Sequence, residues 1–230
     1  MFQQKSTTII SIEANIGAGK TTLLEKLRLQ LRLHLESANE NKNIIFLEEP
    51  VKIWETIQDA SGNTMIQKFY ADQNKYAFSF QIMAYISRLS LLKKTIRENP
   101  CSIIITERSL NTDKMVFAKM LFDSGLIEDV NYQIYLKWFD EFAEECSLNK
   151  IIYINADPEI CYGRIKKRSR VGESCIPLAY LQDCHKYHEN MIDTLTLNVE
   201  LLILNGNDDI IENCNILNEW IAKISNFICK

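Results

Sequence analysis

The stretch from Ser11 to Thr22, SIEANIGAGKTT, combines small residues with a lysine and two threonines, as loops that bind phosphate do. It follows an apolar run, and a helix beginning at Lys20 would add its positive N-terminus to the loop's inward N–H groups. We expect Lys20 to reach the outer phosphates of a polyphosphate, and the Thr21 hydroxyl to bind Mg²⁺. The predicted loop spans residues 14–21, and its phosphate contacts are assigned to Asn15, Ile16, Gly17, Ala18, Gly19, Lys20, Thr21 and Thr22.

Ala14 departs from this pattern, because the first position of such a loop is usually glycine. An alanine is tolerated there if its φ is negative, and Gly17 and Gly19, which lie nearest the phosphates, are both kept. We therefore expect phosphate binding to persist.

Charged residues stand where two further strands are expected to end. Glu49 follows the run NIIFLE and precedes Pro50, and Glu107 and Arg108 close the run CSIIITE. Parallel sheets place ligands at the carboxyl ends of their strands, so these side chains are candidates for proton transfer, metal binding and charge neutralisation. A solvated acidic loop and a strand-end salt bridge are the simpler alternatives.

Two other polar clusters are open to several interpretations. The basic run of Arg164, Lys166, Lys167, Arg168 and Arg170 would ordinarily be a solvated helix face, and a nucleic-acid contact is a second possibility. His185 and His188 stand three apart on a predicted helix, but no third metal ligand is evident. We expect both histidines to belong to a polar helix face.

The elements that position these residues alternate between strands and helices. Strands are predicted at residues 7–13, 43–48, 101–107, 150–156 and 199–205, which indicates an α/β protein with a parallel sheet covered on both faces. No repeat or Gly/Pro-rich linker divides the chain, so residues 1–230 are expected to form one domain.

The segment after Lys20 has two competing periodicities. Alternate leucines from Leu27 to Leu35 favour a strand, whereas Leu23, Leu27 and Leu31 form a helical stripe. A helix is preferred, because the residues are good helix formers and phosphate binding needs a helix N-terminus. Leu29 would then lie under a neighbouring helix.

The composition excludes several classes of protein. The 230 residues carry a net charge of −4, which gives no bulk attraction to nucleic acid or to an anionic membrane. Seven cysteines without a C-x-x-C pair are expected to be buried thiols in a reducing compartment. No apolar run approaches the roughly 20 residues that span a bilayer, and no leader peptide is recognisable. We expect a cytoplasmic protein without nucleic-acid or membrane partners.

Four more stretches make the chain resemble the deoxynucleoside kinase family of the deoxycytidine, deoxyguanosine and deoxyadenosine kinase type. They are EEPVKIW, FSFQIMAYISR, ERSLNTDKMVF and RIKKRSRVGESCIPLAYL, and they follow the phosphate loop in the family's order. The resemblance implies a P-loop kinase fold with a five-stranded parallel sheet flanked by helices, and a homodimer packed through helices. It also implies transfer of the γ-phosphoryl group of ATP, or another nucleoside triphosphate, to the 5′-hydroxyl of a deoxynucleoside with Mg²⁺.

The resemblance assigns the site residue by residue. Glu49 becomes the general base, Arg108 and Lys20 assist catalysis, and Glu107 joins Thr21 at the metal. The basic run becomes an arginine-rich lid at about residues 164–175, in which Arg164, Arg168 and Arg170 contact the triphosphate. The nucleoside contacts are Glu49, Trp54, Tyr70, Phe80, Gln81, Arg88, Arg108, Asp113, Phe117 and Glu173, with Tyr76 completing the wall.

Arg88 and Asp113 are further expected to pair at the floor of the base pocket. Family members with this pair favour cytosine and purine deoxynucleosides over thymidine, so the same preference is expected here. Two alternatives stay open: a nucleoside monophosphate kinase of the thymidylate type, and a catalytically silent member that serves as a binding module, for which Ala14 is the suggestive feature.

Overall fold

The computed structural model describes residues 7–37, 43–168 and 176–229, with side chains described outside residues 32–37. Its centre is one parallel sheet of β1 (Thr8–Ala14), β2 (Ile44–Leu47), β3 (Ile103–Glu107), β4 (Lys150–Asn155) and β5 (Glu200–Asn205). The strand order is β2-β3-β1-β4-β5. All five predicted strands are confirmed, with every end within two residues of its predicted place.

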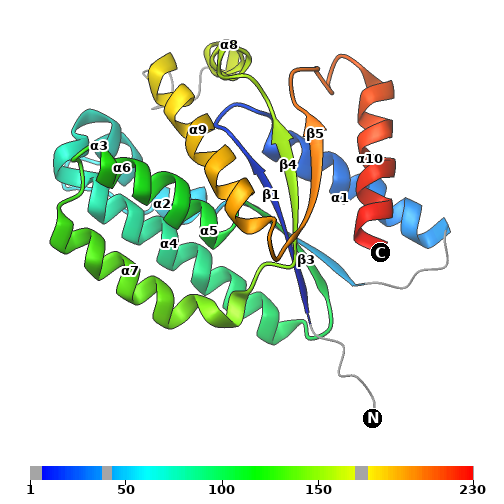
Figure 1. Ribbon diagram of the computed structural model, residues 1–230, viewed down its shortest axis with the longest axis horizontal. Coiled ribbons are helices and arrows are strands. Elements are labelled where there is room, and N and C mark those ends of the chain that lie inside the picture. Colours follow the sequence, from blue (N-terminus) through cyan, green and yellow to red (C-terminus); the bar gives the residue numbers. More distant parts are fainter. Residues whose placement is uncertain (1–6, 38–42, 169–175, 230) are drawn as a thin grey trace.

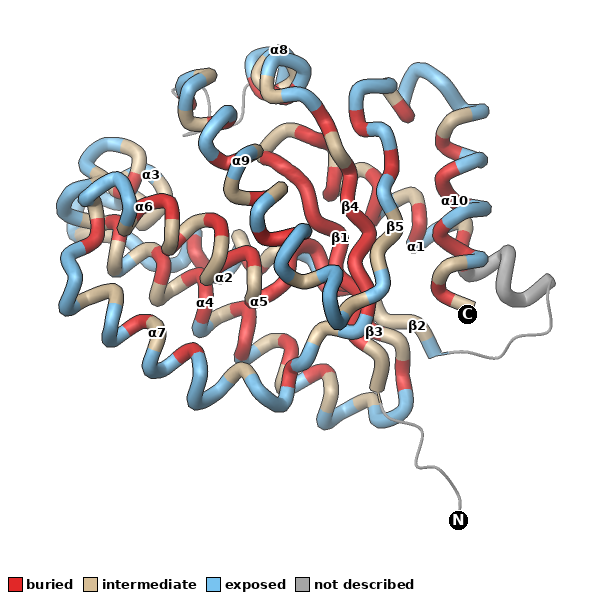
Figure 2. The backbone as a smooth tube through the Cα atoms, in the orientation of Figure 1, coloured by how far each residue is buried: buried red, intermediate tan, exposed pale blue. Residues whose placement is uncertain are grey.

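Alternation along the strands divides the core between the two faces of the sheet. Ile10 and Ile12 of β1 face α1 (Lys20–Ser37) and α10 (Cys214–Cys229), whereas Ile9 packs with α4 (Gln73–Glu98) and α7 (Asp129–Ala143). Tyr153 of β4 packs on the same side against α9 (Leu178–Leu195). Figure 1 shows α1 and α10 together on one side of the sheet and α9 crossing the other. β1 and β4 are therefore buried along nearly their whole length (Figure 2).

Helix α1 begins at Lys20 as predicted. Leu23, Leu24, Leu27 and Leu31 are all buried, so the helical stripe rather than the alternating pattern decides the conformation. Leu29 is 68% exposed, so the expectation that a neighbouring helix covers it is wrong. Its position opposite the buried stripe turns it away from the sheet.

The remaining helices build the wall beside the carboxyl ends of β2 and β3. The short α2 (Val51–Glu55) and α3 (Met65–Ala71) precede α4, and α3 starts with a capping box between Thr64 and Gln67. After β3 comes one continuous helical run: α5 (Leu110–Thr112), the π-helical η1 (Asp113–Ala118) and α6 (Lys119–Asp123). A 3₁₀ turn, η2 (Glu144–Cys146), follows α7, and α8 (Pro158–Arg168) follows β4.

The cysteines are less uniformly buried than expected. Cys146, Cys161 and Cys184 are buried free thiols, but Cys101 and Cys214 are exposed. Within the described ranges, no helix combines the length and the apolar character needed to cross a membrane.

Candidate active site

The loop between β1 and α1 has the geometry of an anion cradle. Gly17 and Gly19 have φ values of +82° and +96°, in the left-handed region that favours glycine. A Cβ on Gly17 would come within 2.7 Å of the Cys161 carbonyl oxygen, whereas a Cβ on Gly19 would meet nothing within 4 Å. Gly17 thus seats the loop on α8, and Gly19 leaves space beside the N-terminus of α1.

Ala14 fits this loop without strain. It is the last residue of β1, it is fully buried in the core, and its φ is not positive. Its carbonyl oxygen accepts from Arg108 Nη1 at 3.1 Å and from Lys20 Nζ at 3.3 Å. The side chain therefore fills core space, and the backbone of Ala14 serves the site.

Lys20 is held inside the loop. Its Nζ also donates to the Asn15 carbonyl oxygen at 2.9 Å, and only 6% of the residue is exposed. Burial, helped by the charge of Arg108, lowers the pKa of Lys20 to about 8. A polyanion that replaced these carbonyl contacts would favour the charged amine. The Asn15 side chain points elsewhere, because its Nδ2 donates to the Leu181 carbonyl oxygen of α9 at 2.8 Å.

Thr21 and Glu107 meet at the start of α1. The Thr21 hydroxyl donates to Glu107 Oε1 at 2.8 Å. A hydroxyl and a carboxylate beside a phosphate loop are the oxygen ligands that Mg²⁺ accepts, with substrate phosphates and water completing its shell. Among the described residues, no group of three or more His, Cys, Asp or Glu side chains could hold a metal ion.

Arg88 of α4 binds two carboxylates and one backbone carbonyl at the carboxyl edge of the sheet. Its Nε donates to Asp113 Oδ2 at 2.9 Å, its Nη2 to Glu49 Oε1 at 2.8 Å, and its Nη1 to the Glu107 carbonyl oxygen at 2.7 Å. The predicted approach of Arg88 and Asp113 is thus seen, but the contact between Arg88 and Glu49 was not expected. Burial raises the pKa of Asp113 to about 6, and the charge of Arg88 opposes that rise.

Glu49 lies directly beyond β2, where its carboxylate meets several cations. Burial raises its pKa, but Arg88, Arg108 and Lys20 outweigh burial and hold the pKa of Glu49 below its ordinary value. Arg108 Nε is 3.5 Å from the same Oε1 atom that Arg88 contacts. The Glu49 side chain is 23% exposed and lines the cavity, so it can still reach a ligand.

Arg108 adopts a left-handed backbone conformation, with φ at +63°, which costs a non-glycine residue about 1–2 kcal/mol. Neighbouring bonds hold it there: its N–H donates to the Ile12 carbonyl oxygen at 3.1 Å, and the next N–H, of Ser109, donates to Glu13 Oε1 at 2.9 Å. Glu13 is fully buried and also accepts from the Thr112 hydroxyl. This turn directs the Arg108 guanidinium toward the phosphate loop, with the carbon between its nitrogens 4.8 Å from the centre of the Phe117 ring.

One cavity of about 860 Å³ joins these groups. The predicted site residues that line it are Ile16, Gly17, Gly19, Lys20, Thr21, Thr22, Glu49, Trp54, Tyr70, Phe80, Gln81, Arg88, Glu107, Arg108, Asp113, Phe117 and Arg168. Gln81 Oε1 is buried and has no hydrogen-bond partner in the described structure. A buried acceptor without a partner is costly, so a ligand that donates to it would relieve that cost.

The apolar end of the cavity is aromatic. Phe80 stacks on Phe69 with ring centres 4.5 Å apart, and it meets Trp54 edge-on at 5.8 Å. Phe69 was not predicted from the sequence, although it also lines the cavity. Tyr76 packs in the same apolar cluster as Phe69 and Phe80, and its assignment to the wall stays a prediction.

The predicted lid is only partly described. Arg168, at the end of α8, lines the cavity. Arg164 instead donates to three backbone carbonyls, those of Gly206 at 2.7 Å, Asn207 at 3.3 Å and Asp208 at 3.0 Å, and so braces α8 against the loop after β5. Three of its five N–H groups are engaged in these bonds. Arg170 and Glu173 lie outside the described residues.

Sequence reasoning missed His188. It is fully buried rather than part of an outward polar face, and its Nε2 lies 3.3 Å from Arg108 Nη1. Tyr180, two turns earlier on α9, lines the cavity and was also missed. The only signal in the sequence was their position on the helix that follows the basic run.

Comparisons with known proteins agree with this geometry. A family model described as deoxynucleoside kinase matches residues 10–229. A fowlpox virus (strain NVSL) protein described as a probable deoxycytidine kinase is 32% identical over 225 residues, covering 95% of this chain and 87% of that protein. Deoxycytidine kinase 2 of Gallus gallus is 34% identical over 247 residues, covering 98% and 92%. The mitochondrial thymidine kinase 2 of Homo sapiens is 30% identical over 192 residues, covering 83% and 66%.

Proposed function

This chain belongs to the deoxynucleoside kinase family and is a kinase, and from that premise we propose which residues carry the reaction and which substrates it uses. The reaction is transfer of the γ-phosphoryl group of ATP, or another nucleoside triphosphate, to the 5′-hydroxyl of a deoxynucleoside. The observation that supports it most is the single cavity in which a phosphate loop, a paired threonine and glutamate, an ionised carboxylate and an aromatic wall all meet.

The donor binds at the phosphate loop. Lys20 exchanges its carbonyl partners for the outer phosphates, the loop N–H groups and the helix N-terminus bind the remaining charge, and Arg168 approaches from α8. Thr21 and Glu107 would hold Mg²⁺, which would supply neutralisation of phosphate charge. Arg108 adds a fixed positive charge beside the transferring group.

The nucleoside binds at the aromatic end, with its base between Phe80 and Phe117 and near the amide of Gln81. Glu49 receives the proton of the 5′-hydroxyl. Its low pKa suits phosphoryl transfer, because the transition state is loose and the hydroxyl proton leaves late, so orientation of the nucleophile matters more than base strength. Tyr70 and Glu173 are proposed to hold the sugar.

Deoxyadenosine, deoxyguanosine and deoxycytidine are proposed to be better substrates than thymidine. Three of the five N–H groups of Arg88 are engaged with Asp113, Glu49 and the Glu107 carbonyl, which leaves two to donate to a ring nitrogen or carbonyl. A guanidinium fixed in this way also occupies the space that a 5-methyl group would need.

A direct test measures phosphorylation of the four deoxynucleosides and of their monophosphates with ATP and Mg²⁺. We expect monophosphate products from deoxyadenosine, deoxyguanosine or deoxycytidine, with kcat/KM at least about tenfold above thymidine. Lys20→Met should abolish the activity. Phosphorylation of the monophosphates instead would favour the thymidylate-type alternative, and no turnover of any substrate would favour a silent binding module.

The pair that is proposed to set base choice can be tested by Arg88→Met with Asp113→Ala. Removing Arg88 alone leaves the buried Asp113 carboxylate without its cation, at about 3–5 kcal/mol, and removing Asp113 alone leaves Arg88 with Glu49 as its carboxylate partner. Each single change should harm every substrate. The double variant should raise the ratio of thymidine to deoxycytidine kcat/KM by at least about tenfold. The kcat should fall for both substrates, because Glu49 also loses its contact with Arg88. An unchanged ratio would show that the pair does not select the base.

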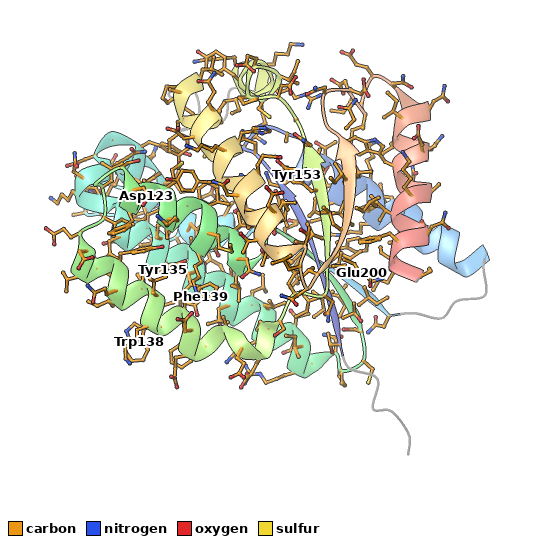
Figure 3. All side chains as sticks on the ribbon, in the orientation of Figure 1. Asp123, Tyr135, Trp138, Phe139, Tyr153 and Glu200 are labelled. Atoms are coloured by element: carbon orange, nitrogen blue, oxygen red, sulfur yellow. The ribbon has the colours of Figure 1, made fainter. Side chains whose placement is uncertain are left out.

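We further propose a homodimer formed through α7. Val130, Ile134, Trp138 and Phe142 recur every fourth residue on its outer side, and each is at least 42% exposed. Figure 3 shows Trp138 on that side, whereas Tyr135 and Phe139 point inward. A continuous exposed apolar stripe is typical of an interaction surface. A cytoplasmic location is proposed from the composition alone.

A further inference from the structure

His188 is a buried titratable group in contact with the site, and the mechanism above gives it no role. It lies on α9, is 0% exposed, and its ring meets that of Phe117 edge-on at 6.2 Å. Its two nitrogens have different partners. Nδ1 lies 2.7 Å from the Cys184 carbonyl oxygen, and Nε2 lies 3.3 Å from Arg108 Nη1.

These partners fix the protonation of the ring. A carbonyl oxygen can only accept, so Nδ1 carries the proton and donates to Cys184. A guanidinium can only donate, so Nε2 is the unprotonated nitrogen and accepts from Arg108. Burial and the neighbouring charge of Arg108 hold the pKa of His188 well below its ordinary value, which agrees with a neutral ring.

His188 bonds to the guanidinium nitrogen of Arg108 that also contacts the phosphate loop. The same Nη1 atom donates to the Ala14 carbonyl oxygen at the start of the phosphate loop, and Nε approaches Glu49. Phe117 packs against one face of the guanidinium. Without His188, the guanidinium would keep a backbone carbonyl and Glu49 as polar partners, and it could rotate about its side-chain torsions toward the carboxylate.

We propose that His188 is a positioning residue for phosphoryl transfer, in which the neutral imidazole orients the Arg108 guanidinium between Glu49 and the phosphate loop. This inference rests on the proposed role of Arg108. It also makes α9 part of the catalytic apparatus, because the same helix accepts a hydrogen bond from Asn15 of the loop through the Leu181 carbonyl.

Two substitutions separate the two nitrogens. His188→Gln can place an amide oxygen where Nε2 lies and so retain an acceptor for Arg108, whereas His188→Asn is shorter and can replace only the Nδ1 donor to Cys184. We expect kcat to fall by about tenfold to a hundredfold in His188→Asn, with the nucleoside KM changed less than about threefold, and to recover most of its parental value in His188→Gln. His185→Asn, three positions earlier, is the control and should leave both constants unchanged.

A double-mutant cycle with Arg108 distinguishes positioning from a general structural role. In an Arg108→Met background, His188→Asn should cause no further loss of kcat, because the group that it orients is already absent. Additive losses of kcat in the double variant would overturn the proposal. Equal losses of kcat in His188→Gln and His188→Asn, accompanied by a lowered Tm in both, would also overturn it.

A measurement on the free protein keeps this test separate from the proposed function. ¹⁵N NMR of the His188 ring should show a protonated Nδ1 and an unprotonated Nε2 whose signal moves in Arg108→Met. If the parent phosphorylated no deoxynucleoside, the proposed function would fail, and a positioning role in that reaction would fail with it. An unchanged Nε2 signal would overturn the contact itself, even in an active kinase.

Discussion

Three cations surround the Glu49 carboxylate, and together they decide its charge. Arg88 and Arg108 contact its Oε1 directly, and Lys20 acts on it through space. Because these charges hold the pKa of Glu49 below its ordinary value despite burial, the carboxylate stays ionised to a lower pH than a free glutamate does. We therefore expect that protonation of Glu49 causes no fall in kcat between pH 7 and pH 5, because this range lies above the ordinary glutamate pKa of about 4.3.

Glu49→Gln should keep the shape of the site while removing the proton acceptor. We expect kcat to fall by about 10²- to 10⁴-fold with little change in the nucleoside KM, measured by steady-state kinetics. Glu48→Gln is the matched control, since Glu48 is exposed and pairs with Arg28 at 3.0 Å at the surface. Equal activities of the two variants would remove Glu49 from the mechanism.

Loss of the Lys20 proton should lower the kcat/KM for ATP at alkaline pH. Its pKa is lowered to about 8, so the amine of the free protein loses its proton, and with it its charge, as the pH rises through that value. The kcat/KM for ATP should then fall by up to about tenfold per pH unit above 8, whereas kcat should hold to higher pH because bound phosphates raise the pKa again.

Lys20→Arg checks this assignment, because a guanidinium stays charged up to a pH of about 12. Activity should be lower overall, but the alkaline limb should be gone. A limb that persists unchanged in Lys20→Arg would have to come from another group.

At the scale of helices and strands, local patterns in the sequence were sufficient to predict the five strands and their parallel arrangement. The apolar β-rich runs predicted all five strands, and the rule that ligands gather at the carboxyl ends of parallel strands placed Glu49 and Glu107 at the same edge. The start of α1 at Lys20 followed from the loop chemistry.

The sequence could not predict which way side chains point or which residues of other helices and loops they contact. Leu29 has the residue type expected of a buried position, yet it faces outward. Arg164 looks like a phosphate ligand but meets three carbonyls, and His188 reaches a residue 80 positions away. Such contacts depend on the packing of α8 and α9 and leave no periodic signal.

The two glycines of the phosphate loop should differ when replaced by alanine. Both have positive φ, so each variant carries a backbone cost of about 1–2 kcal/mol. Gly17→Ala must also push Cys161 and Ile165 of α8 aside, at about 1–3 kcal/mol more, whereas Gly19→Ala meets open space. Urea unfolding should therefore show a larger loss of stability in Gly17→Ala than in Gly19→Ala. Equal losses would mean that Cys161 and Ile165 of α8 can move aside at little cost.

For the whole molecule, α7 separates two environments. Tyr135 and Phe139 on its inner side are buried against Tyr85 of α4, whose hydroxyl donates to the Trp138 carbonyl oxygen at 3.1 Å. On the outer side the rings of Trp138 and Phe142 lie parallel with their centres 5.7 Å apart. Single exposed apolar side chains are ordinary, but a stripe along four helical turns exposes apolar area that a second copy could cover.

Trp138→Glu tests whether that stripe forms the dimer. The contact with α4 uses the backbone carbonyl of Trp138, so the variant should keep its circular dichroism spectrum and its fold. Two copies related by a twofold axis would bring the new carboxylates into the same apolar interface, where burying an unpaired charge is costly. In sedimentation velocity we expect the parent at twice the 26.7 kDa chain mass and the variant at the chain mass. Leu197→Glu, at a side chain 81% exposed in the turn after α9, should stay dimeric. A Trp138→Glu protein that still sediments as a dimer would place the interface on another face, and a parent at the chain mass would show that α7 does not join two copies.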